Sequence, residues 1–260
     1  MDFTIEELSM NAWPSLQTIL YDGWVIRLAN GYTNRPNSIN PIYPSKIKPE
    51  EKFEYCDELF TRHNLLAAYK LVGLGKDKPC DEHKAINAKL EKLNYEIVNE
   101  TSIQVREIST PKKNNFDGMI VSCDFDTQWI ESVIDYNRIE EKHIPTFKKI
   151  LENIAVEKIV VRKEIGNEII GCGYGAIENN HVGIFDIVVK EKYRGKGYGR
   201  EIVETILFEA GKRGVENSYL QVLLNNPVAL HLYEKMGYRE IYRYWYRKKV
   251  IDKKSEGAAI

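Results

Sequence analysis

Apolar and polar positions follow a regular pattern in the second half of the chain. Apolar residues at helical spacing predict helices near residues 129–136 and 147–154, and Asp126 and Thr127 are candidate N-caps for the first. Runs rich in Ile and Val, separated by turn residues, then predict strands. The remaining elements are expected in the order strand, strand, strand, helix, strand, helix, strand, at 158–163, 168–177, 181–189, 200–212, 218–223, 227–236 and 240–250.

The first half of the chain has a weaker pattern. Residues 23–29 look like a strand, and residues 49–63 and 81–93 look helical. Pro49, followed by acidic residues, is typical of the first turn of a helix. Residues 109–115 are polar and rich in turn formers, which predicts a linker between the two halves.

A glycine-dense segment, Tyr193–Arg200, connects the third strand of the second half to the helix that follows. Glycine lets the backbone approach an anion and adopt positive φ. The turn's N–H groups and the helix N-terminus supply positive potential, and Arg194, Lys196 and Arg200 add full charges. The segment is therefore predicted to hold a pyrophosphate.

Three patterns compete for this segment. A Walker A loop, G-x-x-x-x-G-K-[ST], does not occur in the sequence. A dinucleotide fingerprint needs G-x-G-x-x-G and an acidic residue about 20 positions later. Here the glycines are Gly195, Gly197 and Gly199, and position 219 is Tyr. The third pattern, [Q/R]-x-x-G-x-[G/A], is matched by Arg194, Gly197 and Gly199.

Residues 225–238, NNPVALHLYEKMGY, supply the second half of this third pattern. Together the two motifs resemble the acyl-CoA signature of the GNAT superfamily of N-acyltransferases, whose closing helix has the form N-x-x-A-x-x-L-Y-x-K-x-G-[F/Y]. The resemblance covers about residues 155–249 and implies an α/β (α+β) GNAT fold, a mixed and mostly antiparallel sheet flanked by helices. The matching residues are Asn226, Ala229, Leu232, Tyr233, Lys235, Gly237 and Tyr238.

The resemblance also implies which residues bind acetyl-CoA, the co-substrate. The strand before the turn is expected to pair with the pantetheine arm through its backbone, and a splay from the strand at 218–223 would make room for the arm. A backbone N–H near Val189 could polarise the thioester carbonyl. Asn226 is expected to bind the arm, to cap its helix, or both. The expected cofactor-binding residues are Ile187, Val188, Val189, Arg194, Gly195, Lys196, Gly197, Tyr198, Gly199, Arg200 and Asn226.

Two residues are candidates for the catalytic steps. Tyr233, at the family's acidic Tyr position, is interpreted as the general acid, because a phenol is neutral at pH 7 and can protonate a thiolate. The alternative is that Tyr233 only packs on the coenzyme arm. Asp186 is interpreted as the general base or an anchor for the substrate amine. Many family members carry an acidic residue at this position or one place earlier, where this chain has Phe185. Because strand faces alternate, a structural role for Asp186 and a base acting through water stay open.

The last predicted strand interleaves aromatic and basic residues. One face of this strand is expected to line the acceptor pocket, where aromatic rings can hold an alkylammonium group. The alternative is ordinary cross-strand packing of the rings. The residues concerned are Tyr242, Arg243, Tyr244, Trp245, Tyr246 and Arg247.

The first half contains a segment whose sequence is similar to a segment of the second half. Leu90–Ile97 matches Tyr233–Glu240 at an offset of 143 positions, and the same offset aligns two strand-like segments, 101–105 and 244–248. The hypothesis is that the N-terminal half is a diverged GNAT-like domain. Because Leu90 takes the place of Tyr233 and no R-x-x-G-x-G precedes it, this half is not expected to bind CoA.

The alternative to the repeat is a chance match of a common helix ending, and a structure without β-sheet in residues 20–105 would exclude the repeat. The expected domains are 1–112, GNAT-like or accessory, and 113–250, the GNAT acetyltransferase domain. A flexible tail is expected at 251–260.

Composition narrows the partners. The net charge of −1 gives no electrostatic reason to expect nucleic acid or an anionic membrane, and no apolar run approaches the roughly 20 residues that span a bilayer. The first residues lack the features of a signal peptide. The four Cys and five His show no metal-type spacing, so no metal is expected, and the predicted location is cytoplasmic.

The expected function is an N-acyltransferase that moves an acetyl group from acetyl-CoA to a primary amine by direct attack in a ternary complex. Neither motif contains a Cys that could form a covalent acyl-enzyme. The alternative is a non-catalytic CoA-binding regulatory or interaction module. Three points stay open: whether the amine acceptor is a small molecule or a peptide, whether the acyl donor is longer than acetyl, and whether the chain forms a homodimer.

Overall fold

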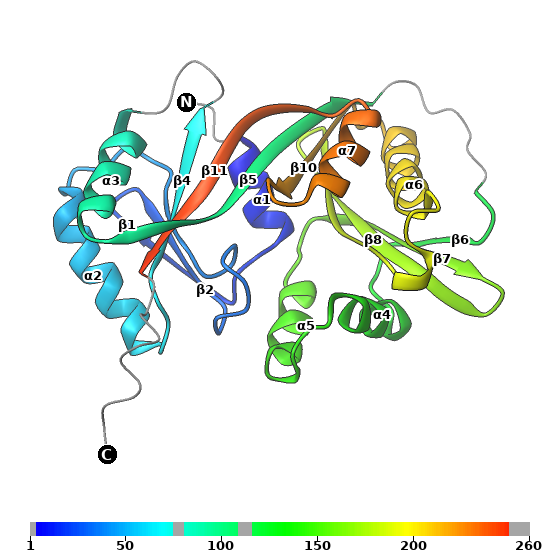
Figure 1. Cartoon of the computed structure of the whole chain (residues 1–260), viewed down its shortest axis with the longest axis horizontal. Helices are drawn as coiled ribbons and strands as arrows, with labels where there is room; N and C mark the ends of the chain where they lie inside the picture. Colours follow the sequence, from blue (N-terminus) through cyan, green and yellow to red (C-terminus); the bar gives the residue numbers. More distant parts are fainter. Residues whose placement is uncertain (1–3, 75–80, 109–115, 250–260) are drawn as a thin grey trace. The chain divides into compact units, whose positions relative to one another are not determined.

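The computed structural model describes residues 4–74, 81–108 and 116–249 (Figure 1). Its α-helices are α1 (Thr4–Ala12), α2 (Pro49–Arg62), α3 (Asp81–Lys92), α4 (Thr127–Asn137), α5 (Ile144–Glu152), α6 (Tyr198–Lys212) and α7 (Pro227–Lys235). Its strands are β1 (Gln17–Tyr21), β2 (Trp24–Leu28), β3 (Ile39–Pro41), β4 (Ala68–Leu74), β5 (Tyr95–Glu107), β6 (Met119–Ser122), β7 (Glu157–Ile165), β8 (Glu168–Glu178), β9 (His181–Val189), β10 (Asn217–Leu223) and β11 (Arg239–Lys249). Short 3-10 turns, η1 (Glu141–His143) and η2 (Glu191–Tyr193), precede α5 and α6.

The chain divides into two compact units. Unit 1 comprises Met1–Leu16 and Ser102–Ile241, and unit 2 comprises Gln17–Thr101 and Tyr242–Ile260. Strands β5 and β11 both cross this division, so the last strand of each half of the chain ends in the unit built mainly from the other half.

The predicted domains, 1–112 and 113–250, differ from these units in three respects, of which the first is that the end of β5, from Ser102, belongs to unit 1. Helix α1 belongs to unit 1, and the end of β11 belongs to unit 2. A single cut cannot describe such an arrangement, because two strands cross between the units. The predicted linker at 109–115 and the predicted tail at 251–260 lie outside the described residues.

The sheet of unit 1 has the strand order β6-β7-β8-β9-β10-β5. Strands β6 to β9 pair antiparallel with their neighbours, and β10 pairs parallel with β9. Gly166, Asn179 and Asn180 have positive φ at the two hairpin turns, as their residue types allow. The predicted mixed, mostly antiparallel sheet flanked by helices is confirmed.

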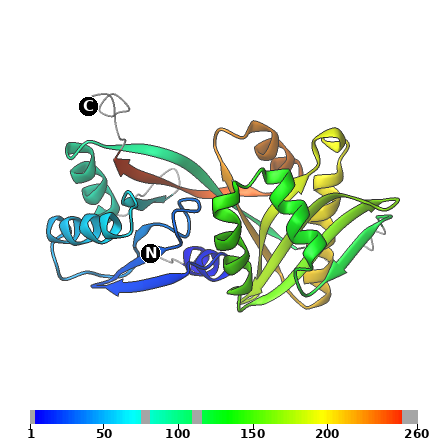
Figure 2. The same cartoon turned by 90° about the horizontal axis from the view of Figure 1, so that it is seen from below.

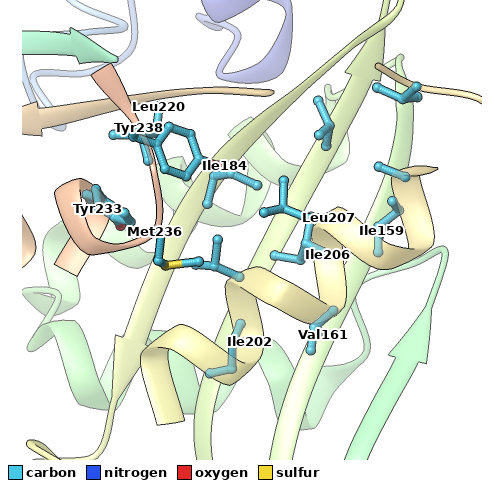
Figure 3. Close-up of a cluster of buried hydrophobic side chains, with 14 of the residues drawn as sticks. Ile159, Val161, Ile184, Ile202, Ile206, Leu207, Leu220, Tyr233, Met236 and Tyr238 are labelled. Carbon is cyan, nitrogen blue, oxygen red and sulfur yellow. The ribbon is translucent and has the colours of Figure 1, made fainter. Parts of the chain in front are cut away.

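Helices cover both faces of this sheet (Figures 1 and 2). Helix α6 packs on one face through a buried apolar cluster, drawn in Figure 3. Helix α4 packs on the other face, where the ring of Trp129 lies 6.2 Å from that of Tyr174 on β8. Because side chains alternate along β8, its two faces carry different residues. The cluster under α6 includes Ile159, Val161, Ile184, Ile202, Val203, Ile206, Leu220 and Val222.

Glycines on β8 let α6 approach the sheet closely. Gly171, Gly173 and Gly175 all lie on the face toward α6. A Cβ atom at Gly173 would lie 2.9 Å from Cγ2 of Ile202, and one at Gly175 would lie 2.5 Å from Cγ2 of Ile206. The close approach holds the beginning of α6, and with it the preceding turn, against the sheet.

We expect Gly175→Ala to lower the free energy of unfolding by about 1–3 kcal/mol, the usual cost of overpacking a core. The added methyl group must displace Cγ2 of Ile206 and Cγ2 of Val182, which would lie 2.5 and 2.8 Å away. Urea unfolding followed by circular dichroism measures the change. Replacing glycine in an open strand would instead raise stability, so an equal or higher unfolding free energy would contradict the close packing.

Unit 2 repeats much of this topology. Its strand order is β1-β2-β3-β4-β11. Strands β1 to β3 pair antiparallel, β3 and β4 pair parallel, and β11 pairs antiparallel with β4. Helix α2 connects β3 to β4 as α6 connects β9 to β10. Residues 20–105 therefore contain a sheet, and the outcome that would have excluded a GNAT-like N-terminal half is not found.

The similarity at an offset of 143 positions also appears in the backbone. Helices α3 and α7 end with the same turn, in which Asn94 and Gly237 have φ of 59° and 85°. The N–H of Asn94 donates to the carbonyl of Glu91 at 3.0 Å, and the N–H of Gly237 donates to the carbonyl of Glu234 at 2.9 Å. Both pairs of residues are related by the same offset, but a common helix ending would look the same, so the support for the repeat comes from the matching order of strands and helices in the two units.

Candidate active site

The glycine-dense turn lies on the surface of unit 1, between β9 and α6. Gly195 and Gly197 have φ of 76° and 89°, left-handed values that glycine adopts without strain. A Cβ atom at either position would meet nothing within 4 Å. The glycines are therefore required by the backbone conformation, and the turn is open to solvent.

This turn offers donors and positive charge to an anion. Gly197 is the N-cap of α6 and has no side chain to cap it, so the first N–H groups of α6 lack an intrahelical acceptor. Arg194, Lys196 and Arg200 are exposed around them. Nε of Arg194 donates to the carbonyl of Val189 at 3.0 Å, which ties the turn to the end of β9. Such an arrangement is suited to a diphosphate.

Glu168, which sequence analysis missed, fixes the segment before the turn. Its carboxylate accepts hydrogen bonds from Lys190 (2.8 Å), Lys192 (3.0 Å) and the hydroxyl of Tyr193 (2.8 Å). The Lys190 ammonium, followed by Lys192 and Tyr193, lowers the pKa of Glu168 to about 2. The two lysines were visible in the sequence, but only the pairing of β8 with β9 brings Glu168 to them.

Strands β9 and β10 separate beside the turn. Their parallel pairing runs over four residue pairs, from Asn217 with His181 to Leu220 with Ile184. Both strands continue beyond these pairs, β10 to Leu223 and β9 to Val189. The predicted splay between residues 184–189 and 218–223 is therefore confirmed.

A β-bulge in β9 occurs where the strands separate. Phe185 pairs with Tyr174 and Val188 pairs with Cys172, so two residues of β9 lie opposite one residue of β8. Asp186 is one of the two and has φ of 48°. A left-handed residue other than glycine is costly, and such strain is common at functional sites. The extra residue also shifts the alternation of faces that the sequence argument about Asp186 assumed.

The turn, the end of β9 and helix α7 meet at Gly199. A Cβ atom there would lie 3.8 Å from Cγ2 of Val189, 3.9 Å from Cγ2 of Ile187 and 3.9 Å from Cδ2 of Leu232. The structure thus brings together three segments that the sequence placed on separate elements. Val188, the other residue expected to act through its backbone, is buried with its side chain on the opposite face.

Tyr233 lies on α7, next to Leu232, at the edge of the apolar cluster (Figure 3). Its side chain is 9% exposed, and burial raises its pKa to about 12. Its ring lies 5.8 Å from that of Tyr238, whose hydroxyl pairs with Ser218 at 2.7 Å. Within the described residues, the Tyr233 hydroxyl has no hydrogen-bond partner. The phenol is therefore protonated at neutral pH and available to a ligand.

Asn226 is the N-cap of α7. Its Oδ1 accepts a hydrogen bond from the N–H of Ala229 at 3.1 Å. The structural explanation considered for Asn226 is thus confirmed. Because its side chain is also exposed, the capping bond leaves the amide nitrogen on the surface of the molecule, and the expected contact with a coenzyme arm stays a prediction.

Asp186 lies on the side of the sheet covered by α4. It contributes to the raised pKa of Cys172 (about 12), whose main cause is burial. Aromatic rings gather on this side. Phe185 stacks on Tyr174 at 5.3 Å, Tyr174 meets Phe125 at 5.2 Å, and Phe185 meets Tyr219 at 6.1 Å. Sequence analysis missed this aromatic group because its members come from four separate segments.

The aromatic residues of the last strand have roles within unit 2. The indole N–H of Trp245 donates to Oδ1 of Asn87 on α3 at 2.9 Å, and Nε of Arg247 donates to the same oxygen at 2.8 Å. Tyr244 is 2% exposed, and the ammonium of Lys70 lies 3.8 Å from its ring centroid. These contacts favour packing, the alternative reading of this strand.

Clusters of metal-ligating side chains and membrane-spanning helices are both absent from the described part of the chain. There, no group of three or more His, Cys, Asp or Glu side chains is arranged to hold a metal ion. In the same residues, no helix has the length and apolar character needed to cross a membrane.

Comparison with known proteins agrees with this geometry. Residues 125–238 match the family model described as Acetyltransferase (GNAT) family. An uncharacterized N-acetyltransferase, YobR of Bacillus subtilis, is 26% identical over 245 residues, 94% of this chain and 97% of that protein. A [ribosomal protein bS18]-alanine N-acetyltransferase of Haemophilus influenzae is 29% identical over 124 residues, 47% of this chain and 80% of that protein.

Solved structures resemble the fold over nearly the whole chain. A GCN5-related N-acetyltransferase from Kribbella flavida has a TM-score of 0.67 at 13% identity, covering 97% of this chain and 96% of its own. A tandem GNAT protein from the clavulanic acid biosynthesis pathway has a TM-score of 0.60 at 11% identity, covering 84% and 78%. A tandem relative fits the repeated topology of units 1 and 2. Residues 125–238 therefore form an acetyltransferase domain of the GNAT family, in a chain whose fold resembles GNAT structures over nearly its whole length.

Proposed function

We propose that the chain transfers an acetyl group from acetyl-CoA to a primary amine, by direct attack in a ternary complex. The observation that carries this proposal is the meeting at Gly199 of the open anion-binding turn, the end of β9 and the helix that bears Tyr233. The residues fit the coenzyme: the turn presents unused N–H groups and cations, and the separated strands leave backbone groups for an extended arm. Acetyl-CoA would supply the thioester that is cleaved.

Each part of the coenzyme has a proposed partner. The turn from Arg194 to Arg200, comprising Arg194, Gly195, Lys196, Gly197, Tyr198, Gly199 and Arg200, holds the diphosphate. Ile187, Val188 and Val189 present the backbone that pairs with the arm, and Asn226 lies at the start of α7. Tyr233 donates a proton or hydrogen bond to the leaving thiolate, a role that its neutral phenol allows at physiological pH.

The acceptor is proposed to be a small-molecule or peptide amine. One relative acts, by its name, on an alanine of a ribosomal protein. This name supports an amine of a peptide or protein as one possible acceptor. We place the reaction in the cytoplasm, without nucleic-acid or membrane partners. The net charge of −1 and the free thiols of Cys56, Cys123 and Cys172 support this placement.

Thiol release tests the proposal. Incubation with acetyl-CoA and a panel of primary amines, from amino acids to short peptides, is expected to release free CoA thiol only when both substrates are present. Reactions without amine and without enzyme are the controls. Tight binding of acetyl-CoA with no thiol release for any amine would favour the alternative, a non-catalytic CoA-binding module, over the enzyme.

Asp186 is proposed to act as the general base or as the anchor of the acceptor amine. Asp186→Asn keeps a residue that tolerates φ of 48° and removes only the charge. If Asp186 is the general base, the substitution should lower kcat about 10²-fold. If Asp186 is the anchor, the substitution should raise KM for the amine and leave kcat unchanged. Steady-state kinetics separate the two, and unchanged kcat and KM would leave Asp186 a structural carboxylate.

A further inference from the structure

Unit 2 offers a direct comparison with the proposed coenzyme site of unit 1. In unit 1 a parallel strand pair, β9 and β10, is connected by a turn and α6, and α7 follows. In unit 2 the parallel pair β3 and β4 is connected by a turn and α2, and α3 follows. The pairing of β3 with β4 consists of Ile39 with Tyr69. The corresponding turn is residues 42–48, which contains no glycine.

A carboxylate of the protein already occupies the turn of unit 2. Asp22, from the turn between β1 and β2, accepts hydrogen bonds from the N–H of Lys46 (2.9 Å), the N–H of Ile47 (2.7 Å) and the hydroxyl of Ser45 (2.7 Å). Lys52, in the first turns of α2, lies 2.9 Å from the same carboxylate with its side chain fully buried. The hydrogen bond from Lys52 is the largest cause, and the other donors add to it, so that the pKa of Asp22 is far below its usual value.

These are the donors that a phosphate would use: two backbone N–H groups in the turn before a helix, a hydroxyl and a cation. In unit 1 the comparable carboxylate, Glu168, bonds to the side chains of Lys190, Lys192 and Tyr193. Unit 1 therefore keeps the backbone donors of its glycine turn available, whereas unit 2 has used the donors of its own turn on Asp22.

An imidazole occupies the space between the strands of unit 2. His83, on α3, is 2% exposed. Its Nδ1 accepts the N–H of Val72 on β4 at 2.8 Å, and its Nε2 lies 2.7 Å from the carbonyl of Pro41 at the end of β3. Because the ring stands between these two backbone groups, it bridges strands that do not bond to each other there. An extended coenzyme arm paired with β3, as proposed for β9 in unit 1, would need the carbonyl of Pro41 and the space that the His83 ring fills.

The offset that relates the helix ends, 143 positions, places His83 on Asn226. In unit 1 the side-chain oxygen of Asn226 caps α7 by accepting the N–H of Ala229. In unit 2 the side chain at the same position turns into the gap between the strands. The two units therefore differ at this position in what the side chain bonds: its own helix in unit 1, the two strands in unit 2.

We propose that unit 2 is a GNAT-like unit whose coenzyme site is filled by the protein itself, with Asp22 in the place of the diphosphate and His83 in the place of the arm. This inference rests on the proposed function of unit 1. It follows that the chain binds one acyl-CoA, in unit 1, and that Asp22 and His83 stabilise unit 2 as an internal substitute for a ligand.

Chemical rescue tests the role of His83. His83→Ala is expected to lower Tm, because it leaves the N–H of Val72 and the carbonyl of Pro41 buried without a partner. Added imidazole is expected to restore part of the lost Tm in this variant. The matched control is His231→Ala, which removes an exposed imidazole from α7 and should show neither effect. An unchanged Tm for His83→Ala, or no response to imidazole, would overturn the proposal.

An anion tests the role of Asp22. In a Gly197→Asp background, which blocks the turn of unit 1, Asp22→Ala is expected to create a site for inorganic pyrophosphate. Pyrophosphate should then raise Tm more in the double variant than in Gly197→Asp alone at equal ionic strength. Glu58→Ala, which breaks an exposed ion pair with Arg62 on α2, is the control for loss of a carboxylate. Equal shifts in all three proteins would overturn the proposal.

Stoichiometry separates this proposal from the proposed function. Calorimetric titration of the full chain with acetyl-CoA is expected to give one site per chain. Two sites would overturn the proposal for unit 2 and leave the function of unit 1 standing. No binding at all would overturn the proposed function, and the imidazole and pyrophosphate responses would still decide whether unit 2 is filled by its own side chains.

Discussion

Tyr233→Phe is expected to lower kcat for acetyl transfer about 100-fold, the lower end of the effect of a general acid. The affinity for acetyl-CoA should stay the same, because the ring that packs in the apolar cluster and against Tyr238 is retained. The Tyr233 hydroxyl has no hydrogen-bond partner within the described residues, so its removal should leave Tm unchanged. Steady-state kinetics and calorimetric binding measure the two effects separately.

Tyr238→Phe is the matched control. It removes a buried hydroxyl that pairs with Ser218 and should cost about 1 kcal/mol of stability, with kcat preserved. A kcat that is unchanged in Tyr233→Phe, or reduced equally in both variants, would show that Tyr233 only packs.

The pH dependence follows from the burial of Tyr233. Its pKa is raised to about 12, above the usual value of about 10 for an exposed tyrosine. The neutral phenol is therefore present below pH 10 and is lost only as the pH rises through 12. Any fall in kcat between pH 8 and 10 must come from another group, and the pH profile of the wild type measures this.

Gly197→Asp is expected to weaken acetyl-CoA binding at least 100-fold while the protein stays folded. Asp is a favoured N-cap, so its carboxylate should accept hydrogen bonds from the free N–H groups at the start of α6. Those groups are the ones proposed to bind the diphosphate, and the added charge repels it. A φ of 89° strains any residue with a side chain, so a moderate loss of stability is expected as well, and the control variant must carry the same strain.

Gly214→Asp is the control for this substitution. Gly214 follows the other end of α6, has φ of 80° and, like Gly197, has open space around it. The same backbone strain and charge are thus introduced far from the turn. Titration calorimetry with acetyl-CoA should show normal affinity for Gly214→Asp. Equal affinities for the two variants would contradict an anion site at the turn.

The elements predicted from the sequence were those with strong periodicity or clear turn residues. The predicted helices match α2 to α7 closely, and Asp126 caps α4 as expected by accepting the N–H of Trp129. The elements missed were α1, β1, β3, β4 and β6. Each is short or lacks an alternating pattern: β3 has three residues, and β6 is an exposed edge strand.

Burial of polar side chains explains part of these failures. Helix α1 buries Glu6 and Ser9 together with its apolar residues, and β4 buries Lys70. A pattern based on apolar positions cannot place such residues inside. Their burial depends on partners that are distant in the chain. The spacing of residues within one segment does not identify those partners.

The residues of the candidate site divide in the same way, into those that could be predicted from the sequence and those that could not. The glycine turn and α7 were predictable because each is a local motif with a fixed spacing. The bulge at Asp186, the carboxylate of Glu168 and the imidazole of His83 depend on which strands lie side by side. Such pairings are formed between segments far apart in the sequence, so the roles of these residues became visible only in the fold.

The crossing of β5 and β11 has a consequence for how the protein can be assembled. A fragment ending after residue 107 would carry β5 but lack β11, the strand that pairs with β4 along Tyr242 to Lys248. The complementary fragment would lack β5, the neighbour of β10. Neither piece could complete its own sheet, so gene halves expressed separately should be insoluble alone and regain solubility only when produced together.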